Sequence, residues 1–318
     1  MQVKLAESAG FCYGVERAVN AVYDEINKGS AKIYTYGPIV HNDIVVNELK
    51  EKGVSVIRDI DELKAMSAAG SLKDATVIIR AHGVGRDVAD ILNSPETRAR
   101  IVDATCPFVK KIHKIVTEHH KNGEKIIVTG TASHPEVIGI LGQIGNDAVV
   151  IENASEAEAF ACAECERNRS CLIDDSNTGS GRQSACPNQG DKNAEYCIVS
   201  QTTFNVEKFK DIVDIFSKKL YHINVVDTIC NATQLRQKEA YELSRTCDAV
   251  IVIGGRHSSN ASKLYDICSK ECSLTYFIES LQDFKEKQLD SSVRCVGITA
   301  GASTPKTIIQ EVLNYVRN

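Results

Sequence analysis

Residues 100–111 read RIVDATCPFVKK, and this stretch joins two different patterns. The β-branched run up to Asp103 is typical of a strand, and the segment after Pro107 has the apolar spacing of a helix. Proline suits the first position of a helix, where no backbone N–H is needed. Cys106 therefore stands at a strand-to-helix junction.

Two further cysteines occupy the same kind of junction, Cys12 in AGFCYGVERA and Cys230 in VDTICNATQL. Cys12 and Cys106 are 94 residues apart, whereas Cys106 and Cys230 are 124 apart. The longer interval contains a Cys-rich stretch, at about residues 161–195, that has the character of an insertion of about thirty residues. Without it the intervals agree. We expect one unit repeated three times as small domains, because solenoid repeats are roughly fifty residues at most.

Polar residues follow each cysteine at matching distances. A strand ends in a polar cluster 28 or 29 residues after the cysteine, at His41, His134 and Ser258. A second strand ends farther on, at His82, Thr202 and Ser303. Ligands of α/β folds collect at the carboxyl ends of strands, so these positions are candidate binding residues.

The remaining sequence alternates β-rich runs with helical stretches, a pattern typical of βαβ units and mostly parallel sheets. We predict an α/β protein of three pseudo-equivalent small domains. The predicted domains are residues 13–105, residues 106–227 with the insertion at about 161–195, and residues 228–318 together with 1–12. The first strand would then belong to the last domain.

Composition excludes several classes of protein. A chain of 318 residues with 43% hydrophobic side chains can bury a full core. The net charge of −5, without a long basic block, argues against a nucleic-acid partner. No apolar run approaches the roughly twenty residues of a membrane span, and the N-terminus lacks a signal-peptide pattern. We expect a cytoplasmic protein with neither nucleic acid nor membrane as partner.

The twelve cysteines point to buried thiols together with metal or redox chemistry, as is usual in a reducing compartment. One thiolate from each of three equivalent domains suits a soft metal or an iron-sulfur cluster. A cubane cluster held by only three thiolates leaves one iron open to substrate. The alternative is that all three are ordinary core cysteines, and their matched positions argue against it.

Nine strings, in order from residue 10 to residue 303, together resemble the LytB/IspH family of 4-hydroxy-3-methylbut-2-enyl diphosphate reductases. They are GFCYGV, HN at 41–42, AHGV at 81–84, DATCP at 103–107, HPE at 134–136, QTT at 201–203, DTICNATQ at 227–234, SSN at 258–260 and TAGAS at 299–303. The resemblance implies a trefoil of three α/β domains around a central 4Fe-4S cluster.

The resemblance also implies a reaction and its residues. Two electrons and two protons remove the C4 hydroxyl of the allylic diphosphate, which yields isopentenyl and dimethylallyl diphosphates in the last step of the non-mevalonate isoprenoid pathway. Cys12, Cys106 and Cys230 match the cluster ligands. The matches to the diphosphate-binding positions are His41, His82, His134, Ser258, Ser259, Asn260 and Ser303.

Two residues match catalytic positions of the family. Glu136 would donate protons, and Thr202 would orient the substrate hydroxyl and pass the proton along. From the residues alone, Glu136 equally suits a first-turn glutamate that complements a helix dipole, and Thr202 suits a polar strand end. The resemblance favours the catalytic interpretation. Because no flavin or nicotinamide motif is evident, we expect electrons from a ferredoxin- or flavodoxin-like protein.

The chain departs from the family pattern in two places. The loop GGRHSSN replaces a Lys-Asn pair, common in the family, by Arg256 and His257. The insertion contains four cysteines with the spacing C-x2-C-x5-C-x14-C, namely Cys162, Cys165, Cys171 and Cys186. Its opening C-x2-C suggests an additional metal, as zinc or a second iron-sulfur site, and a flexible loop with free thiols is the alternative. The remaining cysteines read as core residues.

Two other functions stay open at this stage. One is a non-redox 4Fe-4S hydro-lyase that uses the open iron as a Lewis acid and turns over without reductant. The other is an iron-sulfur sensor or binding protein, which needs no diphosphate pocket. The convergent histidine and serine residues argue against the sensor, and an assay without reductant tests the hydro-lyase.

Overall fold

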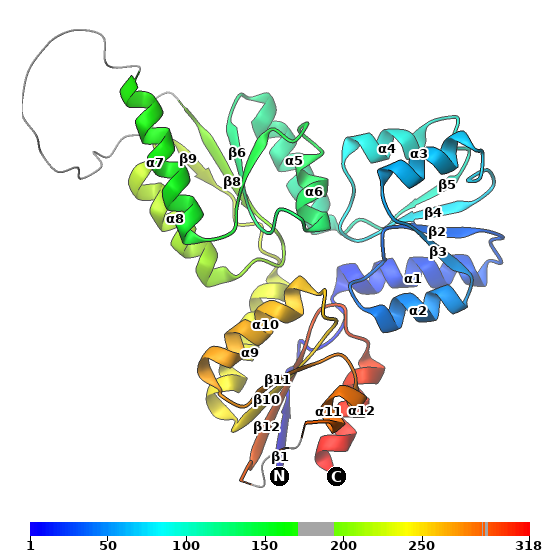
Figure 1. The fold of residues 1–318 in the computed structure, drawn as a ribbon, viewed down its shortest axis with the longest axis vertical. Coiled ribbons are helices and arrows are strands. Elements are labelled where there is room, and N and C mark those ends of the chain that lie inside the picture. The colour runs from blue at the N-terminus through cyan, green and yellow to red at the C-terminus, as the bar shows by residue number, and fades with distance from the viewer. Residues whose placement is uncertain (171–193, 288, 290–291) are drawn as a thin grey trace, which may run out of the picture. The chain divides into compact units, whose positions relative to one another are not determined.

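A computed structural model describes residues 1–170, 194–287, 289 and 292–318 of the chain (Figure 1). It contains three four-stranded sheets, each parallel throughout. Helices alternate with the strands along the chain. The predicted α/β class with parallel sheets is therefore confirmed.

The first sheet has the strand order β3-β2-β4-β5. Its strands are β2 (Ile33–Tyr36), β3 (Val54–Ile57), β4 (Thr76–Ile79) and β5 (Arg100–Asp103). Its helices are α1 (Tyr13–Asn27), α2 (Asp43–Glu51), α3 (Ile60–Ala68) and α4 (Arg86–Asn93).

The second sheet has the order β7-β6-β8-β9. Its strands are β6 (Lys125–Thr129), β7 (Ala148–Ile151), β8 (Tyr196–Ser200) and β9 (Ile223–Val225). Its helices are α5 (Pro107–Lys121), α6 (Pro135–Leu141), α7 (Ala154–Ser170) and α8 (Val206–Lys219).

The third sheet has the order β11-β10-β12-β1. Its strands are β10 (Ala249–Ile253), β11 (Thr275–Ile278), β12 (Cys295–Ala300) and the N-terminal β1 (Gln2–Leu5). Its helices are α9 (Asn231–Thr246), α10 (Ser259–Glu271), α11 (Leu281–Lys285) and α12 (Lys306–Arg317). Val3 of β1 pairs with Val296 of β12, so the first strand completes the last sheet, as the repeat predicts.

The three sheets share one topology. When the strands of each sheet are numbered one to four along the repeat, with β1 as the fourth strand of the third sheet, the spatial order in every sheet is two, one, three, four. The fourth strand of each sheet is followed by one of the three junction cysteines and then by a long helix. The chain divides into two compact units: residues 1–110 with 230–318 (unit 1), which holds the first and third sheets, and residues 111–229 (unit 2), which holds the second. The three predicted domain boundaries stay a prediction.

Helices cover both faces of each sheet, as parallel sheets require. In the first sheet, Ile78 packs with Val22 of α1 and Val45 of α2. Its neighbour Ile79 packs on the opposite face with Leu63 of α3 and Leu92 of α4. Figure 1 shows α1 and α2 on one side of these strands and α3 and α4 on the other. Strand β4 is therefore buried along its whole length, and chemistry is left to the ends of the strands.

The predicted insertion begins inside a helix, because residues 161–170 belong to α7. Cys162 and Cys165 lie on this helix, and Cys165 is buried. Cys171 and Cys186 lie outside the described residues, so the additional metal site stays a prediction. Among the residues that the structure describes, no helix is long and apolar enough to cross a membrane.

Candidate functional site

The three junction cysteines lie in unit 1, each directly before a helix. Cys12 is the N-cap of α1 and Cys230 the N-cap of α9, and neither side chain caps its helix by a hydrogen bond. Cys106 precedes Pro107, the first residue of α5. The backbone N–H of Cys106 donates to the carbonyl of Ala81 at 2.9 Å, and all three residues are half-buried. Each of the three cysteines therefore stands beside the N–H groups of the first turn of a helix.

Electrostatic interactions connect the three thiols. Burial raises the pKa of the Cys106 thiol, and the neighbouring Cys12 and Cys230 raise it further. The backbone N–H groups of Phe108 and Val109, in the first turn of α5, act in the opposite direction and lower it. The helix start therefore supplies donors that favour thiolate, as expected for ligand cysteines.

Cys230 has the same environment with one addition. Burial raises the pKa of this thiol and Cys12 raises it further, whereas the N–H groups of Ala232 and Thr233 and the charge of Arg236 lower it. Arg236 is 3% exposed and donates to the carbonyl of Gly10 at 2.7 Å. A buried cation beside these thiols stabilises negative charge on sulfur or on a bound anionic group. The sequence analysis missed Arg236, because its contacts with Gly10 and Cys230 depend on the fold.

The three cysteines offer soft sulfur ligands of the kind that iron-sulfur clusters use. Among the described residues, the sets of three or more ligand atoms that lie within 4.8 Å of one another do not include Cys12, Cys106 and Cys230.

Gly14 is a second residue that sequence reasoning did not single out. A Cβ at this position would lie 2.7 Å from the sulfur of Cys106, which is too close for any side chain. Gly14 occupies the first turn of α1, two residues after Cys12. Its place in the GFCYGV string is the sequence signal that could have identified it. The glycine lets α1 approach the second cysteine.

Two of the predicted substrate histidines, His41 and His82, are neighbours in unit 1. Their ring centroids are 4.9 Å apart, and the planes are tilted by 33°. Burial, with the charges of Arg80 and His257, lowers the pKa of His41 to about 4. The imidazole of His41 is therefore neutral at pH 7.

The serine and asparagine residues of the third sheet meet the loop of His41. The hydroxyl of Ser303 donates to the carbonyl of His41 at 3.2 Å and lies 3.5 Å from the hydroxyl of Ser258. Ser258 caps α10 by accepting from the N–H of Ala261 at 3.3 Å. Asn260 is 5% exposed, and its amide nitrogen has no hydrogen-bond partner among the described residues. An unused buried donor among hydroxyls is suited to an oxyanion ligand.

Ser259 and Gly255 belong to the same loop. The Ser259 hydroxyl accepts from the ammonium of Lys263 at 2.9 Å, one helical turn farther along α10. A Cβ at Gly255 would collide with the carbonyl oxygen of His41. Glycine is thus required where the loop after β10 touches the loop after β2. This contact brings the predicted serines next to the predicted histidine.

Arg80 is a further residue that the sequence did not reveal as functional. It follows β4 directly, and a Cβ at Gly37 would collide with its guanidinium. Burial lowers the pKa of Arg80 to about 10, so the side chain remains charged at pH 7. Among the described residues no carboxylate pairs with it. Because buried charges are costly without partners, this cation favours an anion near His41.

The remaining predicted residues lie in unit 2, at the carboxyl ends of β6 and β8. The N–H of Thr202 donates to Oε1 of Glu136 at 2.6 Å, and its hydroxyl donates to Oε2 at 2.7 Å. Glu136 is 1% exposed, and its own N–H donates to Nδ1 of His134 at 3.2 Å. His134 is the N-cap of α6, with Pro135 after it. The structure therefore joins Glu136 and Thr202 into one hydrogen-bonded pair.

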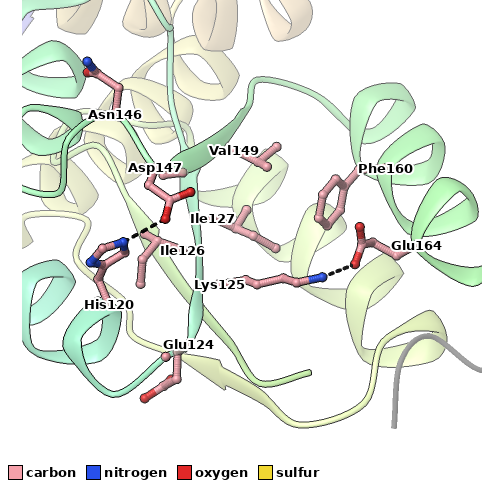
Figure 2. A pocket seen from close by; sticks show the side chains of 12 residues that line it. His120, Glu124, Lys125, Ile126, Ile127, Asn146, Asp147, Val149, Phe160 and Glu164 are labelled. Carbon is pink, nitrogen blue, oxygen red and sulfur yellow. Dashed lines mark hydrogen bonds and ion pairs between the residues drawn. The ribbon is translucent and has the colours of Figure 1, made fainter. Parts of the chain in front are cut away.

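A separate cavity of about 470 Å³ lies at the amino ends of β6 and β7 (Figure 2). Its walls carry two ion pairs, His120 with Asp147 at 2.9 Å and Lys125 with Glu164 at 2.7 Å. None of the predicted site residues lines it. Charged groups on these walls neutralise one another, in contrast to the unpaired donors at the carboxyl ends.

The fold and the cysteines together define a class, namely α/β proteins with repeated four-stranded parallel sheets and a cysteine between the fourth strand of each sheet and the helix that follows. A family model described as LytB protein matches residues 3–317. The chain belongs to the LytB family, which confirms the resemblance found in the sequence.

Relatives match over the full length of the chain. A 4-hydroxy-3-methylbut-2-enyl diphosphate reductase of Clostridioides difficile is 38% identical over 318 residues and covers 100% of both chains. A reductase of the same name from Caldanaerobacter subterraneus is 38% identical and covers 100% of this chain and 97% of its own.

Two solved structures are also similar. One is of (E)-4-hydroxy-3-methyl-but-2-enyl diphosphate reductase, the terminal enzyme of the non-mevalonate pathway. It is 33% identical, with a TM-score of 0.64 over 100% of this chain and 99% of the other. The second is of the E-1-hydroxy-2-methyl-but-2-enyl-4-diphosphate reductase from Plasmodium falciparum, 27% identical, with a TM-score of 0.82 over 100% of this chain and 88% of that one.

Proposed function

We propose that this chain reduces 4-hydroxy-3-methylbut-2-enyl diphosphate to isopentenyl and dimethylallyl diphosphates, the last step of the non-mevalonate isoprenoid pathway. The observation that carries the proposal is the full-length family match, combined with three half-buried cysteines that converge from three helix starts. The non-redox hydro-lyase and the sensor have no observation in their favour.

We assign Cys12, Cys106 and Cys230 as the ligands of a 4Fe-4S cluster. The fit rests on the soft donor atoms and on the helix N–H groups and Arg236 that stabilise negative charge beside them. When bound, such a cluster with one iron not held by the protein supplies electrons and a Lewis-acid site. The two electrons must come from outside the chain, and we propose a ferredoxin- or flavodoxin-like donor.

The diphosphate is held by hydrogen-bond donors at the carboxyl ends of the strands. We assign this role to His41, His82, His134, Ser258, Ser259, Asn260 and Ser303. Support comes from the contacts between the loops of His41 and Ser303, and from the unused amide of Asn260. Arg80 adds positive charge without a carboxylate partner beside His41. Charge-assisted hydrogen bonds of this kind are the strongest available for phosphate oxygens.

The hydrogen-bonded pair of Glu136 and Thr202 moves the proton. When Glu136 is protonated, its Oε2 can donate to the Thr202 oxygen, while the Thr202 hydroxyl passes its own proton to the departing C4 hydroxyl, which leaves as water. The second contact, from the Thr202 N–H to Oε1, fixes the carboxyl group in this orientation. General acid catalysis by a positioned group of this kind contributes about 10²–10⁴-fold.

The test is anaerobic reconstitution with iron and sulfide, followed by an assay with the hydroxylated allylic diphosphate, dithionite and a mediator. We expect a coloured protein that turns over only with reductant. A colourless protein that binds no iron would refute the proposal, and turnover without reductant would favour the hydro-lyase. We also propose a cytoplasmic location, because a thiol-rich chain suits a reducing compartment.

A further inference from the structure

Two cysteines outside the proposed site have their sulfur atoms in contact at the amino end of the third sheet. Cys247 is the C-cap of α9, and Cys295 is the first residue of β12. The thiol of Cys295 donates to the sulfur of Cys247 at 3.1 Å, across 48 positions of sequence. Both residues are half-buried rather than fully buried. The sequence alone assigned both to the core.

The backbone around the two thiols is fixed by three hydrogen bonds. The N–H of Asp248 donates to the carbonyl of Cys295 at 2.9 Å. The carboxylate of Asp248 accepts in return from the N–H groups of Arg294 at 2.9 Å and Cys295 at 2.8 Å. The segments that carry the two sulfurs are therefore tied together before any covalent bond forms.

The packing makes room for this contact. A Cβ at Gly297 would lie 3.3 Å from the sulfur of Cys247, so glycine leaves the space that the sulfur occupies. Cys272 is nearby, but its thiol donates to the carbonyl of Asp248 at 3.5 Å. Within the described part of the chain, no third ligand atom completes a metal-binding set with these two sulfurs. The arrangement suits the chemistry of a thiol pair rather than of a metal.

The Cys247 thiol is protonated at pH 7, which is compatible with the close approach of the two sulfurs. Burial, with the adjacent Cys295, raises the pKa of Cys247 to about 12. Two thiols can touch without the repulsion that two thiolates would experience. A disulfide requires an S–S distance of about 2.05 Å, so the sulfurs need to approach by only about 1 Å.

We propose that Cys247 and Cys295 are a modification site, a dithiol that small-molecule disulfides such as glutathione disulfide oxidise reversibly to an intramolecular disulfide. One cysteine attacks the reagent as thiolate and releases one glutathione, which leaves a mixed disulfide. The other cysteine then displaces the second glutathione and forms the Cys247–Cys295 bond. The chain loses two electrons and two protons, and both are recovered in the two reduced glutathione molecules.

The new bond would fasten the end of α9 to β12. Helix α9 begins at Cys230, so the same helix carries a proposed cluster ligand at one end and the redox-sensitive thiol at the other. The bond closes a long loop and restricts the unfolded chain, which raises thermal stability. We expect the melting temperature of the oxidised protein to rise by roughly 5–10 °C.

The experiment uses the full-length protein, purified without oxygen and incubated at graded ratios of oxidised to reduced glutathione. Free thiols are blocked with N-ethylmaleimide, and the protein is digested without reduction for mass spectrometry. We expect one peptide pair that links Cys247 to Cys295, the loss of two reactive thiols per chain, and full reversal by dithiothreitol. Because the disulfide is mapped in the wild-type chain, this measurement does not depend on whether a variant folds.

Variants identify the partners. Cys272→Ser removes a neighbouring thiol that the proposal does not use, and it should still form the bond and show the higher melting temperature. Cys247→Ser should lose both effects and carry at most a glutathione adduct on Cys295. A wild-type chain that shows no Cys247–Cys295 link in excess glutathione disulfide, or that links Cys272 instead, would overturn the proposal.

Discussion

Helix α9 has a cysteine at each end, and the two thiols have different neighbours. Burial raises the pKa of Cys230, but N–H groups of the first turn and the charge of Arg236 act to lower it. Burial and the adjacent Cys295 raise the pKa of Cys247 to about 12, and the Thr246 hydroxyl and Lys4 lower it less. The end of the helix, rather than the residue type, decides whether a thiol is suited to a cofactor or to a thiol pair.

The same contrast extends to the sheets. Carboxyl ends of the strands carry the cysteines assigned to the cluster, and Arg80 and Asn260, whose Nε and Nδ2 atoms have no hydrogen-bond partner among the described residues. Amino ends carry neutralised ion pairs such as Lys125 with Glu164. Substitutions at the carboxyl ends should therefore change iron content and catalysis. Those at the amino ends should change stability alone.

The largest effect is expected from the two ends of α9. Cys230→Ser should lose most of its iron and at least about 100-fold in activity, because a serine oxygen is a poor match for a soft iron site. Cys247→Ser should keep wild-type iron and turnover. Iron analysis and the reductive assay check both variants. Equal losses of iron and activity in the two variants would contradict the proposed difference between the two ends of α9.

The second effect concerns two buried glutamates of unit 2. Glu136→Gln should lower kcat by about 100-fold or more with unchanged iron content, because the amide cannot supply the proton. The matched control is Glu164→Gln, at the amino end, where Glu164 accepts from the Tyr196 hydroxyl at 2.6 Å. This control should lower the melting temperature and leave kcat unchanged. Normal turnover in Glu136→Gln would contradict the proposed proton path.

A third prediction concerns Arg80 and the pH dependence of stability. His41 has a folded pKa near 4, below its unfolded value near 6.5, so its contribution to stability is present above pH 6.5 and is lost as pH falls toward 4. Arg80→Gln removes a positive neighbour and should raise the pKa of His41. The variant should therefore lose less folding stability from His41 as the pH falls toward 4.

Two measurements check the Arg80 prediction. Imidazole titration by NMR should show the higher pKa of His41, and the assay should show KM raised by about tenfold at constant iron content. Arg58→Gln serves as the control, because Arg58 is exposed and paired with Glu62 at 3.0 Å. An unshifted His41 together with an unchanged KM would show that Arg80 plays no part in anion binding.

The smallest effect is expected at the amino end of the second sheet. Asp147→Asn breaks the ion pair with His120, in which the side chain of Asp147 is 83% exposed. Exposed pairs contribute about 0–1 kcal/mol, so the loss of unfolding free energy should stay below about 1 kcal/mol. Denaturant titration measures it. A larger loss would mean that the cavity of Figure 2 depends on this pair.

The sequence predicted the elements that are buried or repeated. Central strands such as β4 and β10 consist mainly of β-branched residues and are buried throughout, which distinguishes them from any helical pattern. The strands β3 and β11 were not predicted, because both are short edges, with polar or partly exposed residues that weaken the apolar signal. The helical start of the insertion was missed although residues 154–170 are rich in alanine and glutamate, which favour helix.

Contacts between distant residues could not be predicted from local pattern. The bonds between Glu136 and Thr202 join positions 66 apart, and the thiol contact joins positions 48 apart. Arg80 and Arg236 acquire their significance from burial, which depends on the folded chain. The family resemblance implied that Glu136 and Thr202 are catalytic, but only the folded structure shows the hydrogen bonds between them.

The pairing of β1 with β12 sets an order of events during synthesis on the ribosome. The first and second sheets draw their strands from continuous stretches of chain and can form soon after those stretches emerge. Residues 2–5 leave the ribosome first but have no partner until residues 295–298 follow. Cys12, just beyond β1, is thus made first and positioned last, so iron and sulfide should be inserted after translation is complete.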